Sequence, residues 1–415
     1  MSSAFPILDN PQKTSLPEGW KLIQVGKHAK LVAGGTPSTL NSQYWENGDV
    51  LWMRSGDIHK KRVYEVDGRI TELGLKNSSA ALLPVNSILV ALAGQGKTRG
   101  TVAINKVELS TNQSVAAIIP DKEIDYEFLF YNLDARYELL RRLSTGDGGR
   151  GGLNLQILKD IFCALPPLPE QRKIAEILST WDEAIAKTER LLAALRARKK
   201  GLMQRLLTGQ VRFAGFDDEW REQKLSDVIE LKHGYQFRQY DFVDHGISII
   251  KIGNVVGSTL DLSSLTFVDE NREKEFKDFI IKNGDILMSL TGNIGRVVEV
   301  KSQNRPLLQN YRVGKFEPKA GLDKRYMKFL LSSPLLTQQL NKFANQSAQA
   351  NFGKQDLDKL TMQIPQDFIE QRKIADFLDI CDQEVGASAK KIEALKQQKK
   401  GLMQRLLTGQ VRVRI

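Results

Sequence analysis

Two long stretches of the chain carry apolar residues at a spacing of seven, which predicts two long amphipathic helices. Between residues 171 and 207 there is no proline, and Gly209 stands where a helix commonly ends. The same pattern returns between residues 371 and 407. In each stretch two apolar series offset by four residues form one seam. The predicted seam positions are Ile174, Leu178, Trp181, Ile185, Leu192, Leu195, Leu202, Leu206, Ile374, Leu378, Val385, Ile392, Leu395, Leu402 and Leu406.

A long helix with a single apolar seam needs a partner, and the equivalent helix of the same chain is available. Each helix would be about 55 Å long at 1.5 Å per residue. Two similar units in one chain tend to be related by a pseudo-two-fold axis, and such an axis makes the helices antiparallel. We therefore expect an antiparallel coiled coil with a globular part at each end.

The whole chain is a tandem repeat with an offset of 200 residues. KKGLMQRLLTGQVR occurs at 199–212 and again at 399–412, and Trp20 and Trp220 keep the same offset. The chain therefore predicts an α+β protein of two mixed α/β globular domains joined by two helices. The predicted domains are 1–168 and 210–368 for the globular parts, 169–209 and 369–410 for the helices, and 411–415 for a tail.

The segment LVALAGQGKTRG at 89–100 has the spacing of a relaxed phosphate-binding loop. A nucleotide site would need a helix directly after Thr98, but the sequence continues with Gly100 and the β-branched run TVAI, which indicates a strand. The second copy has Gly295 where the first has Lys97. The pattern favours a turn between two strands, with variable polar side chains at its tip.

Composition adds a basic balance and little candidate chemistry. The formal net charge is +11 over 415 residues, which is common in proteins that bind a polyanion. Cys163 and Cys381 are the two cysteines, and the four histidines share no metal-ligand spacing, so we expect no metal site. The N-terminal residues lack the pattern of a secretory signal, and we expect a cytoplasmic protein.

The order of domains resembles the specificity subunit of Type I restriction-modification enzymes. The resemblance rests on PPLPEQRKIAEIL and KKGLMQRLLTG in the first helix region and on their counterparts 200 residues later, and it covers the full length. It implies two target recognition domains, each reading one half of a split DNA sequence, with helices that set the spacing and dock two methyltransferase subunits. Restriction subunits with translocase and nuclease activity would then join.

The resemblance also implies that this chain has no catalytic residues and binds no cofactor itself. S-adenosylmethionine, ATP and Mg²⁺ would be bound by the partner subunits. The residues agree, since the chain contains neither an N-P-P-Y nor a D-P-P-Y motif of an adenine methyltransferase. The second helix region departs from the pattern by beginning IPQDFIEQ, which concerns how the chain enters that helix.

Candidate DNA contacts are basic and amide side chains near predicted turns, because arginine and lysine bind phosphates while arginine, asparagine and glutamine read base edges. Arg99 is the first choice. Its replacement by alanine should cost about 1 to 3 kcal/mol and relax one base position if it reads a guanine, or weaken binding to all sequences alike if it holds a phosphate. The full set is Arg54, Lys60, Lys61, Arg62, Gln95, Lys97, Arg99, Arg150, Lys251, Asn254, Asn293, Arg296, Arg305 and Arg312.

Three functions of different classes remain open from the sequence. A DNA-reading subunit predicts salt-sensitive binding to a bipartite target. A coiled-coil adaptor predicts partner capture without DNA binding. A phosphate-loop enzyme predicts ATP binding that Lys97→Ala abolishes. The two divergent globular domains on matching helices favour the first, because an adaptor has no need for two versions of one fold.

Overall fold

The protein, seen as a computed structural model, is described for residues 15–144, 152–301, 305–344 and 351–415. The chain forms two compact units. Unit 1 comprises residues 1–188 together with 391–415, and unit 2 comprises residues 189–390. The predicted division placed each helix in a domain of its own, whereas each compact unit contains one half of both long helices.

The two long helices are α7 (Leu168–Leu206) and α12 (Phe368–Leu406), each of 39 residues. At 1.5 Å per residue each is about 58 Å long. They end a few residues earlier than the predicted domain limits, because residues 207–209 form a turn that closes on Gly209, whose φ of +72° favours glycine. Gly409 repeats this ending with a φ of +71°.

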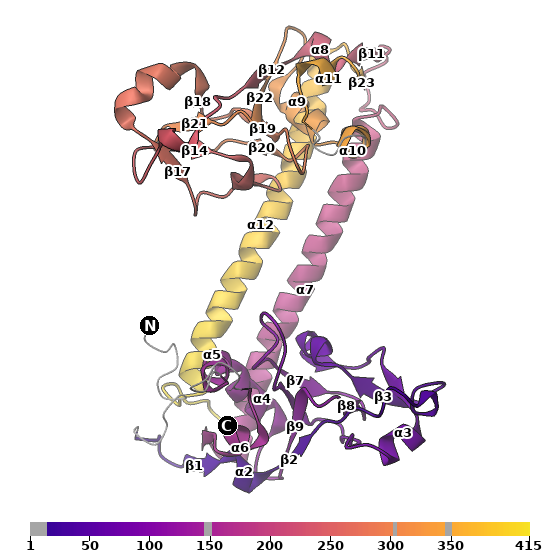
Figure 1. Cartoon of the computed structure of the whole chain (residues 1–415), viewed down its shortest axis with the longest axis vertical. Helices are drawn as coiled ribbons and strands as arrows, with labels where there is room; N and C mark the ends of the chain where they lie inside the picture. The colour runs from indigo at the N-terminus through magenta and orange to yellow at the C-terminus, as the bar shows by residue number, and fades with distance from the viewer. Residues whose placement is uncertain (1–14, 145–151, 302–304, 345–350) are drawn as a thin grey trace. The chain divides into compact units, whose positions relative to one another are not determined.

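Unit 1 contains a five-stranded sheet in the order β2-β9-β6-β7-β4. All its neighbours are antiparallel except β4 and β7. Helix α4 lies between this sheet and the first half of α7 (Figure 1). The strands are β2 (Ala29–Ala33), β4 (Arg62–Val63), β6 (Ile88–Ala91), β7 (Val102–Asn105) and β9 (Val115–Pro120), and the helix is α4 (Tyr126–Ala135).

The remaining elements of unit 1 form two smaller sheets and short helices. The three-stranded sheet consists of β3 (Val50–Met53), β5 (Arg69–Ile70) and β8 (Ser110–Thr111), and the two-stranded sheet of β1 (Lys21–Gln24) and β10 (Phe162–Leu165). The short helices are α2 (Val25–His28), α3 (Glu72–Lys76), α5 (Tyr137–Leu143) and α6 (Leu155–Lys159).

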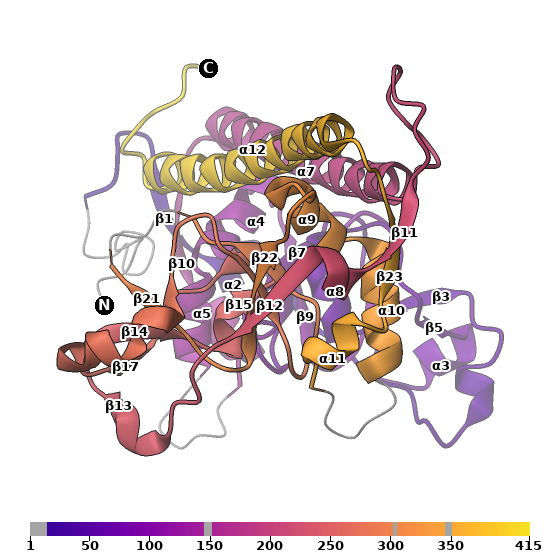
Figure 2. The same ribbon diagram turned by 90° about the horizontal axis from the view of Figure 1, so that it is seen from above.

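Unit 2 repeats the central part of this arrangement. Its four-stranded sheet has the order β12-β22-β19-β20, which corresponds strand by strand to β2-β9-β6-β7. Helix α9 lies between this sheet and the first half of α12 (Figure 2). The elements are β12 (Ile229–His233), β19 (Ile286–Ser289), β20 (Val297–Glu299), β22 (Val313–Pro318) and α9 (Lys324–Leu331).

Outside this shared core unit 2 has its own elements. A five-stranded sheet is built of β13 (Phe242–Val243), β14 (Ile247–Ile250), β17 (Thr266–Val268), β18 (Ile280–Ile281) and β21 (Leu307–Gln309). Two short sheets are β11 (Arg221–Lys224) with β23 (Thr361–Ile364) and β15 (Val255–Val256) with β16 (Thr259–Leu260), and the helices are α8 (Leu225–Val228), α10 (Pro334–Ala344) and α11 (Lys354–Leu357).

In each unit the long helices pack against one another and against the globular core. In unit 1, Ile174 and Leu178 of α7 share a buried cluster with Met403 and Leu406 of α12. In unit 2, Ile374 and Leu378 of α12 share one with Met203 and Leu206 of α7. Every predicted seam residue is buried or half-buried.

The observed repeat confirms the predicted α+β class. Two ion pairs show the relative direction of the helix halves within each unit, because the residue numbers of the paired side chains rise along α7 while they fall along α12. Asp182 pairs with Lys399 at 2.5 Å, and Glu170, at the start of α7, pairs with Arg412, beyond the end of α12. The equivalent pairs of unit 2 are Asp382 with Lys199 and Glu370 with Arg212. The helix halves of each unit are therefore antiparallel.

Candidate functional site

The first turn of each long helix contains a buried carboxylate that holds two other parts of the chain. Glu170 has no exposed side-chain surface, and its oxygens accept two hydrogen bonds from the Arg412 guanidinium at 2.7 and 2.8 Å. The Trp20 indole donates a third at 3.2 Å. We call Trp20, Glu170 and Arg412 the first junction cluster. The hydrogen bond to Glu170 raises the pKa of Arg412. The guanidinium therefore stays charged and attaches the segment after α12 to the start of α7.

The second junction cluster, Trp220, Glu370 and Arg212, repeats this geometry in unit 2. Arg212 donates to the two oxygens of Glu370 at 2.8 and 2.9 Å, and the Trp220 indole donates at 3.1 Å. Sequence reasoning passed over both clusters, although EQRK, VR and the tryptophans repeat with the same offset. The identical geometry fixes how the helices join both globular domains.

A buried glutamine follows each of these glutamates and ties the helix to the next layer. Gln171 accepts a hydrogen bond from the backbone N–H of Asp125 at 2.8 Å, directly before α4. Gln371 accepts the equivalent bond from Asp323, directly before α9, at 2.7 Å. Glutamine at this position satisfies main-chain groups that the helix start would otherwise bury without a partner.

The segment between β6 and β7 connects two antiparallel strands, as the sequence predicted for the apparent phosphate-binding loop. Helix α5 supports it from one side, since Tyr137 donates to the Lys97 carbonyl at 3.0 Å and Arg141 donates to the Gly96 carbonyl at 2.9 Å. Gln95 and Lys97 are exposed at the tip, and Arg99 is half-buried. The helix N-terminus that a phosphate-binding loop requires is absent from this turn, so the motif is not a nucleotide site of that kind.

The other basic candidates of unit 1 divide by their partners. Arg54 is exposed, and Lys60 is exposed while donating to the Glu65 carbonyl at 2.9 Å. Lys61 instead pairs with Asp134 of α4 at 2.6 Å.

Arg62 lies 4.0 Å above the Phe130 ring and pairs with Glu127. These contacts tie the segment at β4 to α4 and give Lys61 and Arg62 structural partners. Their contacts with DNA stay a prediction. Arg150 lies outside the described residues.

The candidates of unit 2 divide in the same way. Asn293 on the β19–β20 turn is exposed, as are Arg305 and Arg312. Arg296 is half-buried and donates to the Val255 carbonyl at 3.2 Å. Three of the six candidates of unit 2 therefore present their side chains to solvent.

Lys251 and Asn254 belong to one loop and are more enclosed. Burial lowers the pKa of Lys251, whose ammonium lies 4.1 Å from the centre of the Phe242 ring. Asn254 is 8% exposed, accepts from the Lys251 N–H at 2.9 Å, and donates to the carbonyls of Asp261 and Ser264. Its polar atoms are occupied inside the loop, so the expectation that Asn254 reads a base is withdrawn.

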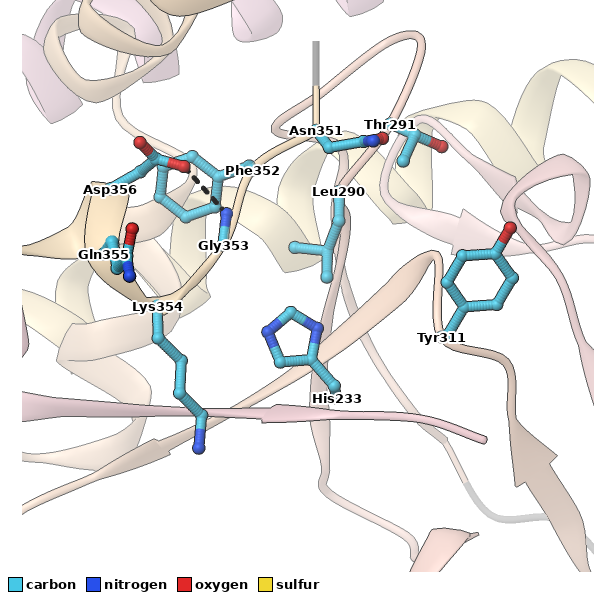
Figure 3. Close-up of a pocket in the computed structure, with 10 residues that line it drawn as sticks. All are labelled: His233, Leu290, Thr291, Tyr311, Asn351, Phe352, Gly353, Lys354, Gln355 and Asp356. Carbon is cyan, nitrogen blue, oxygen red and sulfur yellow. Dashed lines mark hydrogen bonds between the residues drawn. The ribbon is translucent and has the colours of Figure 1, made fainter. Parts of the chain in front are cut away.

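A pocket of about 490 Å³ lies beside the β19–β20 turn of unit 2 (Figure 3). Leu290 and Phe352 are its buried apolar side chains, and its polar ones are supplied by four separate segments. The lining is His233, Leu290, Thr291, Tyr311, Asn351, Phe352, Gly353, Lys354, Gln355 and Asp356. Sequence reasoning missed the polar members, and the signal available to it was the position of His233 directly before the repeated Gly234.

The described residues offer few other groups for chemistry. Within them no three His, Cys, Asp or Glu side chains gather in a way that could hold a metal ion, and no helix is long and apolar enough to cross a membrane. Burial raises the pKa of the Cys163 thiol to about 11, and burial raises the pKa of Cys381 as well. Both thiols therefore stay protonated at neutral pH, and neither is an activated nucleophile.

Comparison with known proteins shows that both copies of the repeat match one protein family. Residues 17–197 and 217–397 each match the sequence model of the family described as the Type I restriction modification DNA specificity domain. The chain belongs to this family. Its two matched regions each comprise a globular domain and the larger part of one long helix. As a member of the family it is a specificity subunit of a Type I restriction-modification system, a non-catalytic component.

Well-described specificity subunits are similar to this chain in sequence. The chain is 26% identical over 414 residues to the Type I restriction enzyme MjaVIII specificity subunit of Methanocaldococcus jannaschii, covering 96% of this chain and 94% of that protein. It is 30% identical over 176 residues to the EcoR124I/EcoR124II specificity subunit of Escherichia coli, which covers 41% of this chain and 43% of that subunit.

Solved structures agree on the fold of the specificity domain. A structure described in connection with complex assembly and conformational transition of the Type I R-M system has a TM-score of 0.61, with 17% identity, and the match covers 96% of this chain and 100% of that one. The Type I restriction-modification S subunit from M. genitalium has a TM-score of 0.58 with 16% identity, covering 95% and 98%.

Proposed function

We propose that this specificity subunit reads a bipartite DNA sequence, with the globular domain of each unit recognising one half. The observation that carries the proposal is the contrast between the two copies. The junction clusters repeat almost atom for atom, whereas the turns and loops at the far side of the shared sheet differ in sequence. A protein that held one kind of partner twice would have no use for that divergence.

The exposed polar side chains of the turns supply the chemistry for DNA. In unit 1 they are Arg54, Lys60, Gln95 and Lys97, with half-buried Arg99, and in unit 2 Asn293, Arg305 and Arg312. Lysine and arginine suit phosphates, while arginine, asparagine and glutamine suit base edges in the major groove. The net charge of +11 supports a polyanionic partner.

The long helices would fix the distance between the two half-sites and dock two methyltransferase subunits. The sequence KKGLMQRLLTGQVR is identical in both helices, including positions that face solvent. Identical outer surfaces in two related positions suit two copies of one partner. Restriction subunits would join this complex, and S-adenosylmethionine, ATP and Mg²⁺ would be bound by those partners. This chain would work with them in the cytoplasm.

The test is a single-molecule sequencing map of methylated bases in the source organism, with and without this gene. We expect one asymmetric split motif to disappear when the gene is deleted and to return with the gene on a plasmid. If no motif changes, DNA binding by the purified complex decides. Binding that falls steeply with salt supports the proposal, and the absence of DNA binding would favour a coiled-coil adaptor.

A further inference from the structure

The strand registers show which residue of unit 1 corresponds to each residue of the unit 2 pocket. His233 ends β12 and lies opposite Gly314 of β22. Ala33 ends β2 and lies opposite Ala116 of β9. Both strands begin opposite the proline that ends the neighbouring strand, so the registers match. Ala33 is therefore the counterpart of His233.

Tyr311 corresponds to Gln113 by the same reasoning. Each follows an asparagine, Asn310 or Asn112, whose side-chain oxygen accepts a hydrogen bond at 3.2 Å from the backbone N–H two residues further on. The shared turn fixes the alignment of the two loops. A phenol in unit 2 thus replaces an amide in unit 1.

The other two lining segments align through the main chain and the core. The Leu290 N–H donates to the Arg312 carbonyl directly before β22 at 3.0 Å, and the Leu92 N–H donates to the Ser114 carbonyl directly before β9 at 2.8 Å. This equivalence pairs Thr291 with Ala93. Helices α11 and α6 each bury a leucine at their fourth residue, Leu357 and Leu158, and this places Lys354 opposite Leu155. Asn351 then corresponds to Gly152.

The two copies therefore differ in a consistent way at this place. Unit 2 lines the pocket with polar side chains, and unit 1 has small, apolar or different ones at the same positions. The pairs are His233 with Ala33, Thr291 with Ala93, Tyr311 with Gln113, Asn351 with Gly152 and Lys354 with Leu155. Because the backbone around them is shared, the change concerns what the surface contacts and not how the domain folds.

The exposure of these side chains indicates the size of the ligand. His233, Asn351 and Lys354 are exposed around the buried Leu290 and Phe352 (Figure 3). Pockets for small molecules usually enclose most of the ligand and are lined mainly by apolar groups. An open rim of polar groups suits an edge of a larger molecule that lies across it.

The polar groups are suited to a base pair and its phosphate. Partial burial and the nearby Lys354 ammonium lower the pKa of His233, although a backbone hydrogen bond at Tyr311 opposes them. The imidazole is then neutral near pH 7, with one donor and one acceptor. The Tyr311 hydroxyl accepts from Arg312 Nε at 2.9 Å and can still donate its own proton.

The amide of Asn351 has the geometry to pair with an adenine edge, and Lys354 is available to a phosphate. The carboxylate of Asp356 would repel a phosphate, but it is engaged by the Gly353 N–H at 3.0 Å and by Lys359 at 2.8 Å. These bonds hold the acid at the start of α11 and offset its charge.

We propose that this pocket is where unit 2 reads its half of the DNA target. Resting on the proposed function, the proposal gives base-reading roles to His233, Tyr311 and Asn351 and a phosphate-positioning role to Lys354. Arg312, which the sequence singled out, directly follows the lining residue Tyr311, and Asn293 follows Thr291 by two positions. Unit 1 reads a different half because the equivalent positions carry different side chains.

The experiment replaces pocket residues in the chromosomal gene and maps methylated bases. The variants are His233→Ala, Asn351→Ala and Tyr311→Gln, the last of which installs the unit 1 residue. We expect all three to relax or change the same half of the split motif and to leave the other half as it was. Lys277→Ala is the matched control, because Lys277 is an exposed cation of unit 2 outside the pocket.

A variant that methylates no site is examined as the purified complex, with duplexes in which one half-site at a time is scrambled. We expect discrimination at one half-site to fall roughly 5- to 150-fold and discrimination at the other to stay unchanged. Unchanged discrimination, or an equal fall at both half-sites in a folded variant, would overturn the proposal. So would a thermal shift with ATP or S-adenosylmethionine that the variants lose while reading DNA normally. If the unmodified gene yields no split motif and its purified complex binds no DNA, the proposed function itself fails.

Discussion

At the scale of single residues, two buried carboxylates each connect three separate segments of the chain. A buried carboxylate is costly unless its oxygens are paired and hydrogen-bonded. Glu170 and Glu370 each meet this condition with a two-pronged arginine and an indole N–H. Each carboxylate thereby connects a helix start to a globular domain and to the segment that follows the other helix.

Glu170→Ala should destabilise the protein by about 3 kcal/mol, because it leaves the Trp20 indole and the Arg412 guanidinium without their acceptor. Glu370→Ala should cost a similar amount in unit 2. Denaturant unfolding of the full chain measures the change. Glu176→Ala is the control, since this exposed glutamate of the same helix makes only a surface pair with Lys173, and its loss should cost less than about 0.5 kcal/mol. Equal losses of unfolding free energy in Glu170→Ala and Glu176→Ala would show that the first junction cluster stabilises the protein no more than a surface ion pair does.

At the scale of elements, the β6–β7 turn shows how one motif can belong to different structures. The spacing of Gly96, Lys97 and Thr98 fits a phosphate-binding loop, but the residues after it form β7 and not a helix. The carbonyls of the turn are held by Tyr137 and Arg141, and this support leaves the Lys97 side chain pointing to solvent. The β6–β7 turn therefore holds the Lys97 ammonium in solvent on a backbone that α5 keeps in place.

Lys97→Ala should weaken binding of the complex to all DNA sequences alike and reduce the slope of log affinity against log salt by about one, as expected for one lost phosphate contact. Titration of labelled duplexes at several salt concentrations measures this slope. Lys27→Ala, which removes an exposed cation from α2 of the same unit, should leave the slope unchanged. An ATP-induced thermal shift that disappears in Lys97→Ala would instead support the phosphate-loop enzyme.

At the scale of the whole molecule, the chain is organised as a closed cycle. The tail after α12 returns to unit 1, where Arg412 bonds Glu170 and also donates to the Glu18 carbonyl at 2.9 Å. Val413 packs against the unit 1 core. Residues 207–213 make the same connection from α7 to the second copy. The start of the first copy therefore lies beside the end of the second.

A circular permutant should fold and methylate the same motif as the natural chain. New ends at Gly215, an exposed residue of the segment between α7 and β11, would replace the natural ends, which a short linker joins. Circular dichroism and the methylation map measure the outcome. The cyclic description fails if the permutant does not fold while the two halves of the chain fold separately.

Several contacts at the candidate site were beyond the reach of sequence reasoning. Lys61 and Arg62 look like free cations in the sequence, and only the fold brings Asp134 and Glu127 against them. His233 and Lys354 lie 121 positions apart, and the sequence does not indicate that they come together. Their proximity depends on how β12, the β19–β20 turn and α11 meet, which is a property of long-range packing.

The sequence by itself determined the repeat, the two long helices with their seams, and the strand-turn-strand character of residues 88–105. These features are encoded by spacing among near neighbours and by comparison of one copy with the other, so they need no knowledge of the fold. The tertiary structure alone decided that each compact unit combines a globular domain with halves of both helices, that buried glutamates hold the chain ends together, and which polar side chains surround the pocket. Such contacts join residues far apart in the sequence, and their energies arise only when burial removes the surrounding water.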